Sequence, residues 1–234
     1  MKSIKETYND LSKAYEENVD TESPYNTDYE RPAMMKEIPE QLEGVKVLDA
    51  GCAAGWYCEA FVSRGADVTG IDVSSGMVEA AKRRLGVKAA IFCHDLEEAL
   101  PFQNEEFDII VSSLTLHYIK DWGPVFQEFR RVLKPGGILL FSVHHPFMDF
   151  TRFKLEDYFK KQLLTETWTK QNIKADVSFY RRSLQEIITA VSEYLTVEGL
   201  TEPQPEKVMK DKYPKKYTYL MKNPHFLIIK SRKQ

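Results

Sequence analysis

Two aspartates on either side of a run of small residues are the part of this sequence best suited to bind a charged ligand. Asp49 ends an apolar run, and the small-residue stretch 51–55 follows it almost directly. Because small side chains leave the backbone open, such a stretch lets a ligand approach the main chain closely. Asp72 stands about twenty residues past this turn, where an acid can accept hydrogen bonds from ribose hydroxyls. The spacing predicts a site for a ligand that contains a ribose.

The chemistry of the turn separates three classes of ligand. A phosphate-binding loop needs a Lys and a Ser or Thr after its last glycine, and neither follows Gly55. A nicotinamide dinucleotide fingerprint needs glycines where this chain has Ala53 and Trp56. An acid just before the turn repels a pyrophosphate but attracts the amino group and sulfonium of S-adenosylmethionine. The turn therefore favours S-adenosylmethionine; an ordinary strand–helix turn, with Asp72 as a helix cap, stays open as the alternative.

Strand and helix patterns alternate along the chain and place this turn at the end of a strand. Strands are predicted at Val45–Ala50, Val68–Ile71, Lys88–Phe92, Phe107–Ser112, Ile138–Val143, Thr196–Leu200 and His225–Lys230. Helical spacing separates most of them, as in Met77–Leu85 and Trp122–Leu133. This alternation indicates a parallel sheet with right-handed crossovers, in which ligands bind at the carboxyl ends of the strands.

Size and charge narrow the functional classes. The chain has 234 residues, of which 43% are hydrophobic, and a net charge of -3. This length fits one domain with an embellishment, and this charge gives no footprint for nucleic acid or an anionic membrane. The start of the chain does not resemble a secretory signal, and no apolar run is long enough to span a membrane. Three cysteines without a CxxC pair suit reduced thiols in a cytoplasmic enzyme without a metal site.

Five segments, in this order, resemble the class I (Rossmann-like) S-adenosylmethionine-dependent methyltransferases. They are the DxGCxxG turn, GIDVSSGMVEAAKRRL, HDLEEALPF, FDIIVSSLTLHYIKDW and LKPGGILLFSVHHPF. The tail, with FYRRSLQEIITAVSEYLTVEGLTEPQP and PHFLIIK, is similar to a bacterial subgroup of small-molecule methyltransferases. The resemblance implies an α/β fold with a doubly wound, seven-stranded sheet in the order 3-2-1-4-5-7-6, strand 7 being antiparallel, and an inserted lid segment.

The same resemblance divides the chain, as a single methyltransferase domain over 1–234, into four parts. These are an N-terminal helical lid (1–41), a cofactor-binding core (42–149), an insertion expected to act as a substrate lid (150–182) and the C-terminal part of the core (183–234). The insertion is rich in aromatic residues, which suit a substrate pocket or, equally, packing onto the sheet or onto a second subunit. The aromatic positions Tyr8 and Tyr15 recur at helical spacing within the first part.

The resemblance also assigns cofactor-binding residues by position. Along the chain they are Tyr8, Tyr15, Arg31, Asp49, Gly51, Cys52, Ala53, Gly55, Asp72, Val73, Met77, Asp95, Leu96, Ser112, Ser113 and Leu114. The turn would contact the methionine part of the cofactor, Asp72 the ribose and Asp95 the adenine amino group. Arg31 would pair with the cofactor carboxylate; a surface arginine is the alternative. Family members commonly have Gly at the position of Ala53, so a positive φ there would strain alanine by about 1 kcal/mol.

Three histidines are the candidate general bases. The methyl donor is already activated, so alignment of the reactants supplies most of the catalysis, and a base helps when the acceptor is a hydroxyl or a protonated amine. His117 follows the fourth predicted strand, and His144 and His145 follow the fifth, at the ligand edge of the sheet. Histidine titrates near neutrality, which suits proton removal. One of the adjacent pair is expected to point away from the site, and His117 could instead cap a loop.

These observations predict an S-adenosylmethionine-dependent methyltransferase that acts on a small-molecule acceptor, as a monomer or homodimer, with no nucleic-acid or membrane partner. The alternative is a non-catalytic S-adenosylmethionine-binding protein that acts through partners, which the departure at Ala53 motivates. Methylation of RNA or protein is a weaker reading, because no basic face is evident. An NAD-linked oxidoreductase is disfavoured by the turn.

Overall fold

The strands form one seven-stranded sheet and a separate hairpin. The computed structural model describes residues 2–19, 22–170 and 173–234. The strands are β1 (Lys46–Ala50), β2 (Asp67–Asp72), β3 (Ala90–Cys93), β4 (Phe107–Ser113), β5 (Leu133–His144), β6 (Gln162–Lys170), β7 (Ile173–Arg181), β8 (Thr196–Thr201) and β9 (Phe226–Arg232). The sheet order is β3-β2-β1-β4-β5-β9-β8, with β9 antiparallel to both of its neighbours. With the β6–β7 hairpin set aside, this is the predicted order, and the expected fold class is confirmed.

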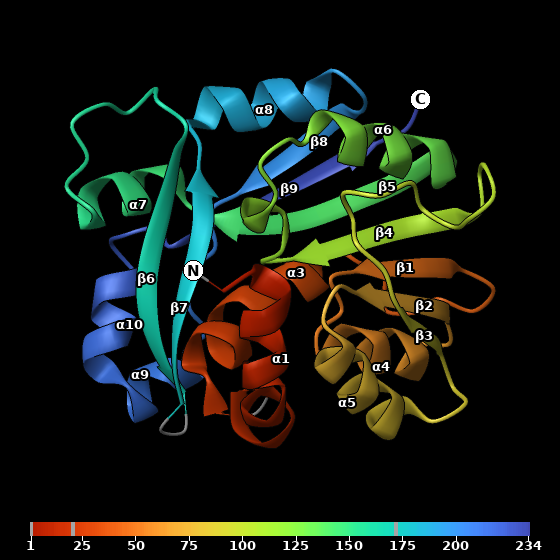
Figure 1. Ribbon diagram of the computed structural model, residues 1–234, viewed down its shortest axis with the longest axis horizontal. Helices are drawn as coiled ribbons and strands as arrows, with labels where there is room; N and C mark the ends of the chain where they lie inside the picture. The colour runs from red at the N-terminus through yellow and green to blue at the C-terminus, as the bar shows by residue number, and fades with distance from the viewer. Residues whose placement is uncertain (1, 20–21, 171–172) are drawn as a thin grey trace.

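Helices cover both faces of the sheet (Figure 1). They are α1 (Ile4–Ala14), η1 (Tyr15–Val19), η2 (Asn26–Glu30), α3 (Arg31–Lys36), α4 (Trp56–Ser63), α5 (Ser75–Leu85), η3 (Leu116–Tyr118), α6 (Gly123–Val132), α7 (Pro146–Arg152), α8 (Leu184–Ser192), α9 (Val208–Lys212) and α10 (Pro214–Leu220). The helices α3, α4 and α5 pack on one face, and α6 and α8 pack on the other. This is the layered arrangement that strand–helix alternation predicts.

Neighbouring residues of the central strands enter opposite halves of the core. In β4, Ile110 packs in the half beneath α6 and α8, whereas Ile109 and Val111 pack in the half beneath α4 and α5. A shift of register by one residue would exchange the two faces, so burial on both sides fixes the strand pairing. The ends of these strands are thereby held in place.

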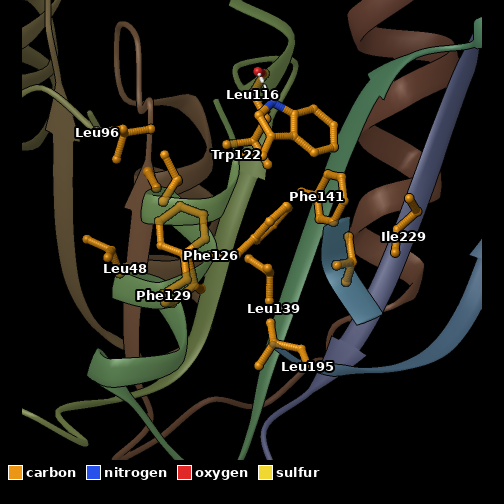
Figure 2. Packing of buried hydrophobic residues seen from close by; sticks show 14 of the residues in the cluster. Leu48, Leu96, Leu116, Trp122, Phe126, Phe129, Leu139, Phe141, Leu195 and Ile229 are labelled. Carbon is orange, nitrogen blue, oxygen red and sulfur yellow. Dashed lines mark hydrogen bonds between the residues drawn. The ribbon is translucent and has the colours of Figure 1, made fainter. Parts of the chain in front are cut away.

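The half beneath α6 and α8 is rich in aromatic rings (Figure 2). Phe126 of α6 lies 5.8 Å, between ring centroids, from Phe141 of β5. The Trp122 indole N–H donates a hydrogen bond of 2.8 Å to the carbonyl of Leu116, in η3 after β4. The core therefore anchors the segment that follows β4, which carries His117.

The first helix and the hairpin lie side by side near the carboxyl ends of the parallel strands (Figure 1). The helix α1 contacts α5 on one side and β7 on the other. Its start is fixed by a capping box in which Ser3 and Glu6 accept each other's backbone N–H groups. The N-terminal helix α1 and the β6–β7 hairpin of the insertion thus lie together over one edge of the sheet.

Several segments differ from the sequence-based expectation. Part of the predicted turn-rich segment Asp20–Asp28 lies outside the described residues, and its end forms the π-helical turn η2. Strand β5 begins at Leu133, before the predicted turn at Lys134–Gly137, because Leu133 pairs with Phe107 ahead of a break in the register. The Pro-bearing stretch after β8, for which no element is predicted above, holds two short helices, α9 and α10. None of the helices in the described part of the chain has the length and apolar character that a membrane crossing needs.

Candidate active site

One cavity of about 730 Å³ lies at the carboxyl ends of the strands. It is lined by the segments that follow β1, β2, β3, β4 and β5, and by parts of α1, η2, α7 and β6. The sequence-predicted residues that line it are Tyr8, Tyr15, Arg31, Gly51, Cys52, Ala53, Asp72, Val73, Asp95, Leu96, Ser113, Leu114, His117 and His144. Residues from distant parts of the chain are therefore gathered around one volume.

Five predicted residues lie outside the lining. Asp49 is buried beneath it, and Gly55 packs against α5, where an added Cβ would lie 3.0 Å from the Ala81 side chain. Met77 is fully buried in a small cluster with Ala54. These three residues therefore lie beneath the lining and support it.

The other two outlying residues are Ser112 and His145. The Ser112 hydroxyl donates to the backbone carbonyl of Ala50 over 2.8 Å, which ties β4 to the end of β1. His145 caps α7 by accepting from the Phe147 N–H, and its other ring nitrogen lies 2.8 Å from Glu202. Because both nitrogens of His145 have partners away from the cavity, we drop it as a candidate base and keep His117 and His144.

The loop after β1 has the backbone shape that small residues permit. Gly51 has a φ of 89°, and a Cβ there would lie 2.3 Å from the Thr115 hydroxyl oxygen, so only glycine fits. Ala53 has a φ of 46°, in the left-handed region that costs alanine about 1 kcal/mol. Leu114, which also lines the cavity, has a positive φ of 48°. Two strained non-glycine residues therefore lie at the cavity, as at many functional sites, while Glu105 and Lys154 have a positive φ outside its lining.

Asp72 holds this loop from the end of the neighbouring strand. Its Oδ2 accepts from the Ala53 N–H over 2.9 Å, and its Oδ1 accepts from the Ser74 N–H over 2.8 Å. Burial raises the pKa of Asp72 to about 6 in spite of these two hydrogen bonds. Each carboxylate oxygen can accept more than one hydrogen bond, so Asp72 can still bind ligand hydroxyls.

Asp49 lies next to that loop but below the cavity floor. Asp49 is 1% exposed. Its Oδ2 accepts a hydrogen bond from the Cys58 thiol over 3.2 Å, and its Oδ1 has no hydrogen-bond partner among the described residues. Burial raises the pKa of Asp49 to about 7. A buried carboxylate oxygen without a hydrogen-bond donor has lost its hydration and gained nothing in return. A positive group bound nearby would offset this cost.

Arg31 and Glu30 are adjacent charged residues in the lining of the cavity, and only Arg31 was predicted from the sequence. The Arg31 guanidinium lies 4.3 Å from the centroid of the Trp56 ring and faces the cavity. Glu30 is buried and accepts from the hydroxyls of Tyr57 (2.8 Å), Ser113 (2.8 Å) and Ser142 (2.5 Å). Sequence reasoning missed Glu30; its partners lie far along the chain, and only its position beside Arg31 could have marked it.

A wall of aromatic rings forms the part of the cavity farthest along the sheet from β2. The wall comprises Tyr118, His117, His144, Phe226 and His225, whose neighbouring ring centroids lie 4.2 to 6.1 Å apart. Burial lowers the pKa of His117 well below its usual value and lowers that of His144 to about 3, so both rings are neutral at physiological pH. A neutral imidazole is the form that can accept a proton.

The amino-terminal lid joins this wall through a tyrosine that sequence reasoning missed. The hydroxyls of Tyr8 and Tyr118 lie 2.7 Å apart, and the Tyr8 ring also packs against Tyr15 at 5.8 Å between centroids. Tyr118 follows His117 directly in the HYIKDW segment, and this adjacency is the signal that could have indicated it. The helix α1 is thus fixed to the segment after β4 across the cavity.

The insertion covers the cavity from the side of the wall. Glu166, Thr167, Trp168 and Thr169 of β6 line it, together with Arg152 of α7, whose guanidinium pairs with Glu166. The following strand β7 ends in two buried arginines that bind backbone carbonyls and stack on aromatic rings. The hairpin is therefore attached to the core at its base and lies over the cavity.

This arrangement fits S-adenosylmethionine. The Gly51 loop admits close backbone approach, Asp72 offers a carboxylate to ribose hydroxyls, and the buried acid Asp49 favours a cation nearby. Arg31 can pair with a carboxylate, and Asp95 can accept from an amino group such as that of adenine. In the described residues, His, Cys, Asp and Glu form no group that could hold a metal ion.

Comparisons with known proteins agree with the geometry. The family model for a methyltransferase domain (Methyltransf_11) matches residues 48–141. An uncharacterized protein of Haemophilus influenzae is 25% identical over 230 residues, which cover 87% of each chain. A malonyl-[acyl-carrier protein] O-methyltransferase of Legionella pneumophila is 30% identical over 184 residues, which cover 73% of this chain and 58% of the relative. The chain spans less than half the length of several other curated relatives that it matches.

A solved structure gives the same result for the whole fold. A Listeria monocytogenes protein assigned as an S-adenosylmethionine-dependent methyltransferase superposes with a TM-score of 0.76 at 26% identity, covering 88% of this chain and 96% of that one. The structural similarity to this protein therefore extends well beyond residues 48–141, which the family model matches. The comparisons indicate an enzyme rather than a non-catalytic binding protein, and its cofactor is S-adenosylmethionine. Residues 48–141 match a methyltransferase domain, and together the comparisons support a class I S-adenosylmethionine-dependent methyltransferase.

Proposed function

We propose that this enzyme transfers the methyl group to a small-molecule acceptor enclosed with the cofactor in the cavity described above. The observation that carries the proposal is the cover over that cavity. The helix α1, the turn η2 and the strand β6 all contribute to its lining. A volume of about 730 Å³ falls in the usual range of small-molecule sites, about 300–1,000 Å³. A partly covered site of this size suits a small acceptor better than a folded macromolecule.

The cofactor half of the cavity lies at β1 and β2. In this proposal Asp72 binds the ribose hydroxyls, and Asp95, with Val73 and Leu96 beside it, binds the adenine. Arg31 pairs with the carboxylate of the cofactor, and Tyr8 and Tyr15 close over it from α1. These assignments are supported by the position of each side chain in the lining.

The acceptor half lies between the aromatic wall and the hairpin. The bound cofactor supplies an activated methyl group, and the residues of the chain bind, orient and deprotonate the acceptor. Neutral His117 and His144 line this half, and Trp168 of β6 also contributes to the cavity lining. The Legionella relative is named for transfer to oxygen, which supports an oxygen acceptor as one possibility for this chain.

The division of the chain follows from the same proposal. Residues 1–41 and 150–182 act as the two lids, residues 42–149 hold the cofactor, and residues 183–234 complete the sheet of a single domain. The helix α7, which begins at Pro146, also contributes Met148 and Arg152 to the lining, and this supports including it in the second lid.

A labelled-methyl experiment tests the proposal. The enzyme is incubated with cofactor labelled in its methyl group and with a cell extract separated into low-molecular-weight, protein and nucleic-acid fractions. We expect label to enter the low-molecular-weight fraction. Asp72→Asn is expected to abolish this transfer, whereas Asp67→Asn, at the exposed opposite end of β2, leaves it unchanged. Label found only in protein or nucleic acid contradicts the proposal.

A further inference from the structure

Two buried polar atoms at the acceptor half lie close to each other and have no hydrogen-bond partner among the described residues. Asp149 of α7 is only 2% exposed, and its Oδ1 has no hydrogen-bond partner among the described residues. The Nδ1 of His144 is also buried and likewise has none in that part of the chain. These two atoms lie 3.7 Å apart. Burying two such groups is costly unless they serve each other or a ligand.

The orientation of His144 leaves its other ring edge for the cavity. His144 lines the cavity and keeps 12% of its side chain exposed. Because Nδ1 is directed toward Asp149, the edge that carries Nε2 is the one that can reach a ligand. Packing holds this orientation: His117 stacks on one face at 4.2 Å, and Phe179 of β7 meets the ring edge-on at 4.6 Å.

The charged and titratable groups around the pair come from α7, β6, β7, η3 and the residue before β9. Arg152 of α7 and Arg181 of β7 favour the ionised form of Asp149, and Glu166 of β6 opposes it. His225, next to β9, and Arg152 disfavour a charge on His144. His117 of η3 stacks on His144 and is neutral.

The two members of the pair are both buried and lie close together. Burial raises the pKa of Asp149 to about 7 and lowers that of His144 to about 3. Both shifts favour the uncharged form of each group, so near neutral pH the pair exchanges a single proton with solvent. Above that pH the pair is an anionic carboxylate beside a neutral imidazole, which is the state of a general base held by an acid.

We propose that His144 and Asp149 together form the general base of the reaction, and that the acceptor therefore presents a hydroxyl or N–H group rather than a carboxylate. This rests on the proposed small-molecule transfer. His144 is the catalytic residue, and Asp149 is a positioning residue that holds the proton on Nδ1 and leaves Nε2 free. A carboxylate acceptor is already ionised at neutral pH and would need no base.

The step balances as follows. The acceptor oxygen or nitrogen forms a bond to the methyl carbon, and the carbon–sulfur bond breaks with its electron pair remaining on sulfur. The proton of the acceptor moves to Nε2 of His144. The imidazolium formed there is neutralised by the Asp149 carboxylate, which lies beside its Nδ1–H.

The surroundings favour a flat, uncharged acceptor. The aromatic wall, with the Tyr25 ring tilted against His225 at 5.2 Å between centroids, offers ring faces. The cation nearest to His144 on α7, Arg152, is already paired with Glu166 of β6. Rings stack well on such surfaces, whereas a carboxylate would have to compete with Glu166 for Arg152. The acceptor class is therefore a phenol-like or N-heteroaromatic ring.

The first test is independent of turnover. Nitrogen-15 NMR of the histidine rings in the full chain distinguishes which ring nitrogen carries the proton. We expect His144 to be protonated on Nδ1 in the wild type and on Nε2 in Asp149→Leu, which removes the acceptor. Asp157→Asn, an exposed acid of the same segment, serves as the control without effect. Titration with S-adenosylhomocysteine shows that each variant is folded. A wild-type His144 protonated on Nε2, or an unchanged ring in Asp149→Leu, overturns the pair.

The second test identifies the acceptor class by measuring whether the labelled product from the low-molecular-weight fraction keeps its label in mild alkali. Methyl esters of carboxylates release volatile methanol in mild alkali, whereas methyl ethers and N-methyl rings keep their label. We expect alkali-stable label, formed at a rate that rises with pH through about 7. Asp149→Asn should lower this rate by about 10²–10⁴-fold and remove the rise, with unchanged affinity for S-adenosylhomocysteine. Alkali-labile label overturns the acceptor class, while absence of label in every fraction counts against the proposed function instead and leaves the NMR result to decide the pair.

Discussion

Asp72 accepts a hydrogen bond of 2.9 Å from the backbone N–H of Ala53, the residue that occupies a left-handed conformation in the loop after β1. The acid proposed to bind the ribose is thus the same group that fixes the loop shape. The strain at Ala53 is offset by this bond, because a buried charged acceptor strengthens an amide hydrogen bond. The departure from the glycine common in the family is therefore accommodated locally.

Replacing Ala53 by Gly should raise the stability of the protein. A φ of 46° is unfavourable for alanine by about 1–2 kcal/mol, and glycine removes this strain. The greater freedom of glycine in the unfolded chain lowers the stability of the folded state by about 0.4–1 kcal/mol. We expect a net gain on the order of 0.5–1 kcal/mol in the free energy of unfolding, measured by denaturant titration. Ala54→Gly, at a buried neighbour that lacks a positive φ, should lower stability. A loss of stability in Ala53→Gly would show that the loop is unstrained.

Gly51→Ala should remove cofactor binding. The new Cβ would lie 2.3 to 2.8 Å from the Thr115 side chain, so the loop or the segment after β4 must move. Gly136→Ala is the matched control, because Gly136 also has a positive φ, of 77°, but has open space around it. We expect the control to lose about 1–2 kcal/mol of stability and to keep its affinity. Calorimetric titration with S-adenosylhomocysteine measures both variants, and equal affinities would count against the close approach at Gly51.

Cofactor binding should release protons near pH 6. Burial holds the pKa of Asp72 at about 6, and donors that bind its carboxylate favour the ionised form, so binding lowers that pKa. The affinity for S-adenosylhomocysteine is then expected to fall as the pH drops below about 6. Titrations in two buffers of different ionisation enthalpy give the number of protons released. Asp72→Asn should release none from this position, and an unchanged proton count in that variant would exclude Asp72 as the source.

Asp49 should lower the stability of the protein as the pH rises. Its folded-state pKa of about 7 lies above its value in the unfolded chain, so its contribution is most favourable below about pH 4 and is lost as the pH passes through about 7. Asp49→Asn, which stays neutral, should therefore gain stability relative to the wild type between those limits, on the order of a few kcal/mol. Denaturant unfolding across this pH range measures the difference. A difference that does not vary with pH contradicts the shift.

The sequence predicted the parts of the molecule that are set by local patterns. The apolar runs at β1 and β4 and the small residues at 51–55 determine a strand, a buried strand and a ligand loop from their own side chains. Gly51, Ala53 and Asp72 accordingly lie where the pattern placed them, around the end of β1 and β2. The order of the sheet followed from the family resemblance and is confirmed.

Long-range partners could not be predicted. Glu30 is buried because three hydroxyls from α4, β4 and β5 bind it, and nothing near it in the sequence indicates those partners. Asp149 and His144 lie close along the chain, but their contact follows from the direction in which α7 leaves β5 after the His145 cap, and the sequence does not indicate that direction. The insertion had no clear periodicity, so its hairpin was not foreseen, although a covering role was.

The most direct test of the account is a crystal structure of the enzyme with S-adenosylhomocysteine. The account predicts density for the ligand inside the 730 Å³ cavity, with its ribose hydroxyls at Asp72 and its sulfur directed toward the half that His144 lines. Density for the ligand at any other surface, or a ribose away from Asp72, would contradict it.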